Sequence, residues 1–168
     1  CRGQCRLAGP LRLVRKLHPE DRPRGRVMAS PYELFGTDAK AEKDGIILDY
    51  GAFWLRIARA GGANKKFARV LDAKLQPYRR QLQAGTMEDE LANRLMAEAY
   101  AEAVILAWGS KEHGDGKMIG RDGEAIEFSR ENVIRLLLDL PDLFADIQNQ
   151  AGRVANFRAA QIEDAAGN

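Results

Sequence analysis

The chain has 168 residues, of which 45% are hydrophobic and 30% are charged, and its formal net charge is +2. This balance is typical of a soluble globular protein and excludes an intrinsically disordered chain. The longest apolar runs, residues 103–108 and 136–138, are much shorter than the roughly 18 to 20 residues that cross a bilayer, so we expect no membrane protein.

The charge is unevenly distributed along the chain. Residues 1–27 carry eight Lys and Arg against two acidic residues, a net charge of +6, whereas residues 28–168 carry 18 against 22, a net charge of −4. Met28, Ala29 and Ser30 resemble a natural start. We therefore expect residues 1–27 to be a basic leader, either upstream sequence or an artefact of expression, and residues 28–168 to form a single helical domain.

A basic targeting arm is the alternative interpretation of the leader, although its Gly and Pro residues interrupt any long amphipathic helix. The leader also holds both cysteines, Cys1 and Cys5. Two cysteines without further Cys or paired His are a weak signal for a metal site and build no disulfide framework. The cysteine-free remainder fits a reducing cytoplasm.

The first element predicted in the body is a β-hairpin over residues 45–60. Two β-branched and aromatic stretches stand there on either side of Asp49-Tyr50-Gly51, which is a hairpin signal. In the second stretch, alternate residues favour one buried face. An isolated hairpin is marginally stable, so we expect it to pack on helices.

A long amphipathic helix is predicted next, with Asn64 as its N-cap after Gly61-Gly62. Its apolar residues recur every three or four positions, which places them on one face. They are Phe67, Val70, Leu71, Leu75, Tyr78 and Leu82. Pro77 should kink or divide this helix, which ends near Gly85.

Four further segments follow this helix. Thr86 is predicted to cap an alanine-rich helix that runs to about Trp108. Residues 118–128 are predicted to form a second small hairpin that turns at Asp122-Gly123. Ser129 then caps a short helix, and Pro141 begins the last helix, whose apolar residues extend to Ile162. The expected fold is α+β, predominantly α-helical, with about four helices and one or two small β-hairpins.

We considered three chemical sites and expect none of them. His113 is the only histidine of the body, and no Gly-x-Ser-x-Gly elbow accompanies it. Asp115, Asp122 and Glu124 lack the spacing of a calcium loop. Residues 60–66 hold two glycines before a helix but lack the spacing of a phosphate-binding loop. We therefore expect no catalytic residue, no cofactor, no metal and no enzymatic activity.

Two surfaces are candidates for binding. The basic residues of the first long helix would suit a nucleic acid or an acidic partner, although pairing with nearby acids explains them equally well. They are Lys65, Lys66, Arg69, Lys74, Arg79 and Arg80. The large aromatics are expected in the core, and any left exposed would mark a partner surface. On this basis Phe144, Ile147, Val154 and Phe157 are the candidate residues for binding a protein partner.

The order and character of several segments resemble the tail assembly chaperones of long-tailed phages and prophages. The resemblance covers most of residues 31–165. The segments that carry it are IARAGGANKKF at 57–67, LQPYRR at 75–80, the alanine-rich helix ending at Ala107-Trp108, GEAIEFSREN at 123–132 and LPDLF at 140–144. The basic leader departs from the family pattern.

The resemblance implies a function without catalysis. Proteins of that family are thought to coat the helical tape measure protein, to recruit subunits of the tail tube, which the major tail protein forms, and then to leave the assembled tail. The chain would therefore act in the host bacterial cytoplasm and be absent from the mature virion, and self-association is a further expectation. A small nucleic-acid-binding protein that uses the basic helix face is the alternative hypothesis, although the net acidic body argues against a nucleic acid as partner.

Overall fold

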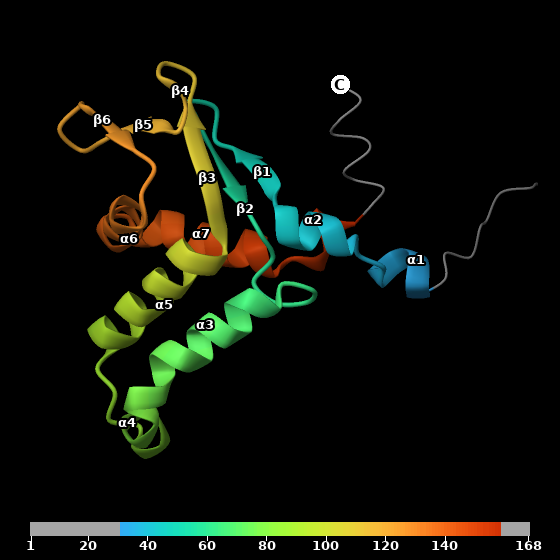
Figure 1. Ribbon diagram of the computed structural model, residues 1–168, viewed down its shortest axis with the longest axis vertical. Coiled ribbons are helices and arrows are strands. Elements are labelled where there is room, and N and C mark those ends of the chain that lie inside the picture. Colours follow the sequence, from blue (N-terminus) through green and yellow to red (C-terminus); the bar gives the residue numbers. More distant parts are fainter. Residues whose placement is uncertain (1–30, 159–168) are drawn as a thin grey trace, which may run out of the picture.

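The computed structural model describes residues 31–158. Figure 1 shows the order of its helices and strands along the chain. These residues form an α+β fold that is mostly helical, as predicted. The helices are α1 (Pro31–Phe35), α2 (Ala39–Asp44), α3 (Lys65–Leu75), α4 (Arg79–Ala84), α5 (Asp89–Ala103), α6 (Arg130–Asp139) and α7 (Pro141–Gly152). The strands are β1 (Ile46–Asp49), β2 (Phe53–Ile57), β3 (Ile105–Ser110), β4 (Gly114–Asp115), β5 (Lys117–Ile119) and β6 (Ala125–Glu127). The prediction for residues 1–27 lies outside the described residues.

Four strands form an antiparallel sheet in the order β1-β2-β3-β4 (Figure 1). The predicted first hairpin is β1 and β2, with Leu48 opposite Leu55. Leu55 in turn lies opposite Trp108 of β3. The inner face of this sheet packs on the buried residues of α5, α6 and α7, and the resulting core includes Leu55, Ile57, Tyr100, Val104, Trp108, Val133, Leu137, Phe144 and Ile147.

The outer face of the sheet is open to solvent among the described residues, and Trp54 lies across it. Trp54 stands opposite Gly109 in the β2–β3 register. A Cβ at Gly109 would lie 2.6 Å from the indole atoms of Trp54, so the absence of a side chain at this position is what allows the indole to lie flat on β3.

The alanine-rich helix ends earlier than predicted. We expected it to reach Trp108, but α5 ends at Ala103 and residues 105–110 form the strand β3. A short apolar run is compatible with either a buried helix or a buried strand, and here the backbone groups of the run pair with β2. The start also differs: the N-cap is Glu88 rather than Thr86, and its side chain makes no capping hydrogen bond.

Several local predictions are confirmed. Pro77 lies in a 3-10 turn, Gln76–Tyr78, that separates α3 from α4. Strands β5 and β6 form the second hairpin, with Met118 opposite Ile126. Ser129 caps α6, and its Oγ accepts a hydrogen bond from the N–H of Asn132 at 3.1 Å. Pro141 occupies the first turn of α7.

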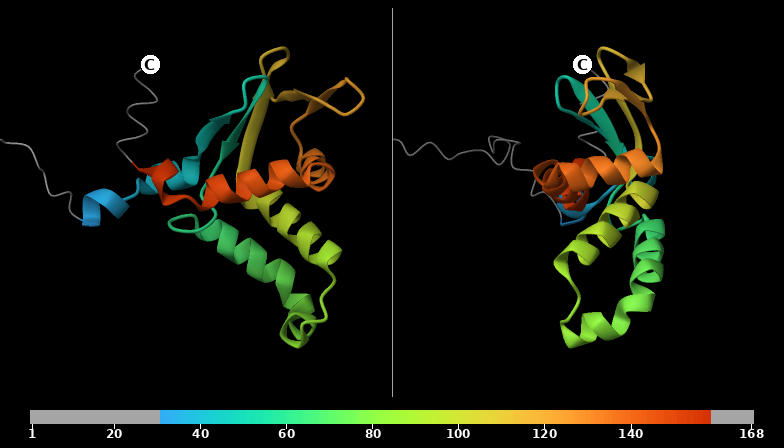
Figure 2. Two further views of the ribbon diagram at one scale, coloured as in Figure 1. Left: turned by 180° about the vertical axis from the view of Figure 1, so that it is seen from behind. Right: turned by 90° about the vertical axis from the view of Figure 1, so that its left-hand side faces the viewer.

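Asn64 occupies the predicted N-cap position of α3, but its side chain does not cap the helix. Its amide instead donates to the carbonyl oxygens of Arg59 at 2.9 Å and Ala103 at 3.0 Å. The residue is only 6% exposed. It therefore ties the start of α3 to the end of α5, and these two helices project together from the sheet as an arm that α4 closes at its tip (Figure 2).

The last apolar stripe is part of the core rather than a surface. Phe144, Ile147 and Phe157 are between 0% and 6% exposed, and Val154 is half-buried. Helix α7 ends at Gly152, and a 3-10 turn, Val154–Phe157, folds Phe157 back inward. In the folded chain the side chains of Phe144, Ile147 and Phe157 thus fill the interior, and the binding of a partner by these four residues stays a prediction. Ile162 lies outside the described residues.

No helix within residues 31–158 is both long enough and apolar enough to span a membrane.

A substitution at Phe157 tests how much the packing of this residue, near the end of the described chain, contributes to the stability of the fold. Its ring is fully buried, and its carbonyl oxygen accepts the N–H of Asp38 at 2.9 Å. We expect Phe157→Ala to lower the free energy of unfolding by about 3 to 5 kcal/mol, as for other buried aromatics. Urea denaturation measures this. Phe35→Ala, at a residue that is 69% exposed, is the matched control and should change stability by less than about 0.5 kcal/mol.

Candidate functional site

The residues considered for catalysis and metal binding do not converge. His113 is exposed in the β3–β4 turn, where its N–H donates to Ser110 Oγ at 3.1 Å. Asp122 accepts the N–H of Glu124 at 3.2 Å, which is turn chemistry. Within residues 31–158 no three His, Cys, Asp or Glu side chains are grouped closely enough to hold a metal ion.

The glycine loop before α3 already holds an anion, and that anion is the carboxylate of Glu42. Glu42 is 1% exposed, and it accepts hydrogen bonds from the N–H of Ala63 and from the guanidinium of Arg59. A Cβ at Gly62 would lie 2.5 Å from this carboxylate. The arrangement explains why the loop resembles a phosphate-binding loop, since its backbone donor meets a side chain of the same protein instead of a ligand.

Burial would raise the pKa of Glu42, but hydrogen bonds from Thr37, Ala63 and Arg59, together with the charge of Arg59, more than offset this and hold the pKa below its usual value. The carboxylate is therefore ionised wherever the chain is folded at neutral pH, and it stabilises the junction between α2 and the β2–α3 loop.

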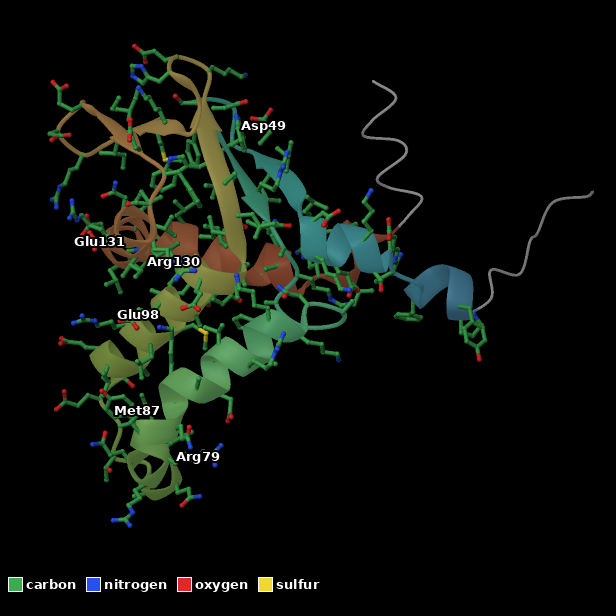
Figure 3. The ribbon with its side chains drawn as sticks, viewed as in Figure 1. Asp49, Arg79, Met87, Glu98, Arg130 and Glu131 are labelled. Atoms are coloured by element: carbon green, nitrogen blue, oxygen red, sulfur yellow. The ribbon has the colours of Figure 1, made fainter. Side chains whose placement is uncertain are left out.

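The basic residues of the arm do not form one patch. Lys65 and Lys66 begin α3, whereas Arg79 and Arg80 begin α4 at the tip, about 20 Å away along a helix that rises 1.5 Å per residue. Arg79 pairs with Asp72 at 2.9 Å. Figure 3 shows Arg79 at the tip and Glu98 further up the arm.

A smaller cluster of charge lies between α3, α5 and α6. Lys74 pairs with Glu98 at 3.0 Å and with Glu102 at 3.8 Å, and Arg130 reaches Glu102 at 3.9 Å. Burial would raise the pKa of Glu98, but the ion pairs with Lys74 and Arg94 lower it overall.

A shallow groove of about 620 Å³ runs beside this cluster, and Lys66 and Arg69 line it with exposed side chains. Of the six basic residues predicted on this helix, three line this groove, namely Lys66, Arg69 and Lys74.

An apolar groove lies between the β5–β6 hairpin and α6. Figure 1 shows these two elements one above the other on the left of the view. Its volume is about 670 Å³. Apolar side chains from both elements line it, namely Ile119, Ile126, Leu136 and Leu140. Ile119 and Leu140 are 43% and 47% exposed, so the groove has an apolar lining that is open to solvent.

Charged side chains surround this lining. Arg121 and Asp122 belong to the hairpin turn, and Arg135 and Asp139 belong to α6. Each side of the groove thus offers one cation and one anion. Such an apolar floor with a charged rim suits the apolar stripe of an amphipathic helix whose flanks are charged.

The sequence reasoning did not find this groove, although a signal was present. Helix α6 carries Val133 and Leu137 on its buried face, and Leu136 together with Leu140, the residue that follows the helix, forms a second apolar face. Two apolar faces on one short helix exceed what a single core contact needs. The second face indicated either a further layer or a binding surface.

The segment that forms the arm and the groove is also the segment that matches a known protein family. Residues 62–168, more than half of the chain, match the family described as YdaY prophage protein. The chain belongs to this family. The match to the YdaY family begins at the loop before α3, so the β1–β2 hairpin lies outside it. No curated protein and no solved structure matches the chain.

Glu42→Gln tests the internal anion of the glycine loop in this YdaY-family chain. The variant keeps the size of the side chain but removes the charge beside Arg59, so we expect the free energy of unfolding at pH 7 to fall by about 1 to 3 kcal/mol. Urea denaturation across pH measures it.

The pH dependence has a defined sign. Because the folded pKa is lowered, the carboxylate's contribution is fully present above the unfolded pKa of about 4.3 and is lost as the pH falls through the lower folded value. The stability difference between the two proteins should therefore shrink below about pH 4. A difference that is constant from pH 7 to pH 3 would contradict an ionised Glu42.

Proposed function

We propose that this prophage protein is a tail assembly chaperone that binds and solubilises the tape measure protein and helps to recruit tail tube subunits. The apolar groove between the β5–β6 hairpin and α6 carries the proposal. The membership in a prophage protein family supports it, as does the resemblance of residues 31–165 to chaperones of long-tailed phages. The action would take place in the host cytoplasm before the mature virion forms.

The groove suits the chemistry of such a partner. A long helical protein that is not yet packed in a tail exposes apolar stripes, and a helix lays such a stripe into an apolar groove through side chains three and four positions apart. Ile119 and Leu140 are 43% and 47% exposed, so covering each of them would contribute about half of the roughly 1.5 to 3 kcal/mol that full burial of such a side chain provides. The charged rim residues Arg121, Asp122, Arg135 and Asp139 would fix the orientation more than the affinity.

A binding role of this kind needs no reaction. Shielding apolar surface is reversible association, so the proposal includes no catalytic residue, no cofactor and no enzymatic activity. Release would require only that the tail tube subunits compete for the same stripe of the tape measure protein.

The double variant Ile119→Glu with Leu140→Glu tests the groove. Both side chains are nearly half exposed, so a carboxylate at either position can reach solvent and the fold should tolerate the change. On binding, however, the two carboxylates in the groove would have to be desolvated. Co-expression with the tape measure protein encoded beside it should give soluble complex for the unaltered chain. We expect at least about a tenfold loss of soluble complex for the variant, which corresponds to about 1.4 kcal/mol.

The matched control is Leu82→Glu, at a leucine that is 52% exposed on α4 and lies outside the groove. It should leave the soluble complex unchanged. If the tape measure protein remains insoluble with the unaltered chain, the chaperone proposal fails. If Leu82→Glu abolishes the complex and the groove variant does not, the partner binds the tip of the arm instead.

The alternative, nucleic-acid binding, rests on the exposed Lys66 and Arg69 in the second groove. It predicts retention of DNA or RNA on a filter at low salt, with affinity that falls steeply as salt rises. The variant Lys66→Ala with Arg69→Ala would then reduce the slope by about two phosphate contacts. We expect no retention at low salt, and salt-sensitive retention that this variant weakens would favour the alternative.

A further inference from the structure

Strand β1 is an open edge of the sheet. It pairs with β2 on one side, and it stands first in the order β1-β2-β3-β4. Within residues 31–158 no segment pairs with its other side. Its residue Ile47 is 57% exposed. Figure 2 shows this edge beside β2, away from the β5–β6 hairpin.

The hydrogen bonds of the hairpin fix which backbone groups face outward. The N–H of Tyr50 donates to Phe53 at 2.9 Å, so residue 50 faces β2. Because the direction alternates along an antiparallel strand, Leu48 and Ile46 also face β2, whereas Ile47 and Asp49 point their N–H and C=O groups away from the sheet. On the other side of β2, the N–H of Ala58 donates to Val104 at 2.8 Å, which agrees with the same alternation.

We infer that this edge is a self-association surface, on which two copies of the chain pair β1 with β1 about a two-fold axis centred on Ile47. In this register Ile47 lies opposite Ile47 of the second copy, and each N–H donates to the other C=O. Asp49 lies opposite Gly45, so each Asp49 N–H donates to a Gly45 C=O. The Gly45 N–H is already bound to Ala41, so four hydrogen bonds join the copies.

The side chains favour this register over its neighbours. A two-fold axis normal to the sheet keeps each face of the sheet on the same side, and it can pass through any residue of the strand. Centring on Leu48 would place the exposed Ile47 opposite Asp49, which sets an apolar side chain against a carboxylate. Centring on Ile47 brings two exposed isoleucines together, with Ile46 opposite Leu48 on the inner face. Centring on Asp49 would oppose two carboxylates, which is destabilising.

The edge also lacks three of the features by which proteins prevent such pairing. Natural edge strands are protected by proline, by lysine or by a bulge. The sequence of β1 is Ile-Ile-Leu-Asp, which has no proline and no lysine, and its register with β2 is regular over all four residues. A symmetric pair of this kind would join two four-stranded sheets into one continuous sheet.

This surface is independent of the chaperone proposal. It lies on the hairpin that precedes the family match at residue 62, and it uses no residue of the apolar groove. A failure of either proposal therefore leaves the other one standing.

A disulfide trap tests the pairing. The full chain with Cys1→Ser and Cys5→Ser provides a cysteine-free background, into which Ile47→Cys is introduced. A hydrogen-bonded antiparallel pair has a Cα–Cα distance of about 5.5 Å, within the range of roughly 4.4 to 6.8 Å that a disulfide needs. Mild oxidation should convert most of this variant into a covalent dimer on a non-reducing gel.

Arg56→Cys is the matched control. Arg56 is exposed and lies directly opposite Ile47 in the hairpin register. Its counterpart in the second copy would be three strand spacings away, about 14 Å, which is too far for a disulfide. We expect at least about tenfold less dimer from this variant. Equal cross-linking of the two variants, or none from Ile47→Cys, would overturn the inference.

Sedimentation of chains without engineered cysteines gives a second readout. The chain with only Cys1→Ser and Cys5→Ser should show a concentration-dependent dimer, and Ile47→Lys should raise its dissociation constant at least about tenfold by opposing two cations. Ile119→Lys, which changes an exposed isoleucine outside the edge, should leave it unchanged. A monomer at every concentration up to about 1 mM, where the binding free energy is only about 4 kcal/mol, would also overturn the inference.

Discussion

The insertion of β3 beside β2 directly after α5 is the constraint on which the rest of this fold depends. Only Val104 separates the helix from the strand, and its N–H still donates to Tyr100 while its carbonyl accepts Ala58. The arm and the sheet are therefore joined without a flexible linker. Asn64 reinforces the junction, because its amide bridges the β2–α3 loop and the last turn of α5.

The other half of β3 positions the groove. Trp108 is fully buried, its Nε1 donates to the carbonyl of Gly116 at 3.2 Å, and its ring meets Phe128 edge to face at 5.4 Å. Gly116 and Phe128 flank the β5–β6 hairpin, and the N–H of Phe128 donates back to Gly116 at 2.8 Å. One tryptophan thus holds the hairpin at the angle that leaves space between it and α6. Tyr50, in the β1–β2 turn, anchors this hairpin to α7 by donating to Asp146 at 2.7 Å. Its pKa is raised by burial and by this carboxylate, so the phenol keeps the proton that it donates.

Local chemistry made much of the fold predictable. The two hairpins, the break at Pro77, the Ser129 cap and the start of α7 at Pro141 all depend on residues within a few positions of each other. Strand β3 was not predictable in this way, because residues 105–108 follow a helix without a break signal and only pairing with β2 decides their conformation. Helices α1 and α2 also went unpredicted, since α2 depends on Glu42 reaching the distant Arg59 and Ala63.

The candidate site was less predictable than the fold for the same reason. Phe144, Ile147 and Phe157 were apolar at helical spacing, but spacing alone does not say whether a stripe meets the core or a partner, and here it meets the core. The groove needs two elements that are each predictable alone, whereas their mutual placement depends on Trp108 and Gly116. Five of the six basic residues of α3 and α4 are exposed, whereas Lys74 is half-buried, and the length of the arm separates the residues at its two ends.

The contact between Trp54 and Gly109 has a consequence for the divergence of this sheet. Since a Cβ at position 109 would meet the indole at 2.6 Å, a side chain can enter at position 109 only if Trp54 moves off β3 or is replaced by a smaller residue. Position 109 lies within the segment that matches the YdaY family, and position 54 lies before it. A side chain gained at position 109 would therefore require a compensating change in the hairpin, outside the matched segment.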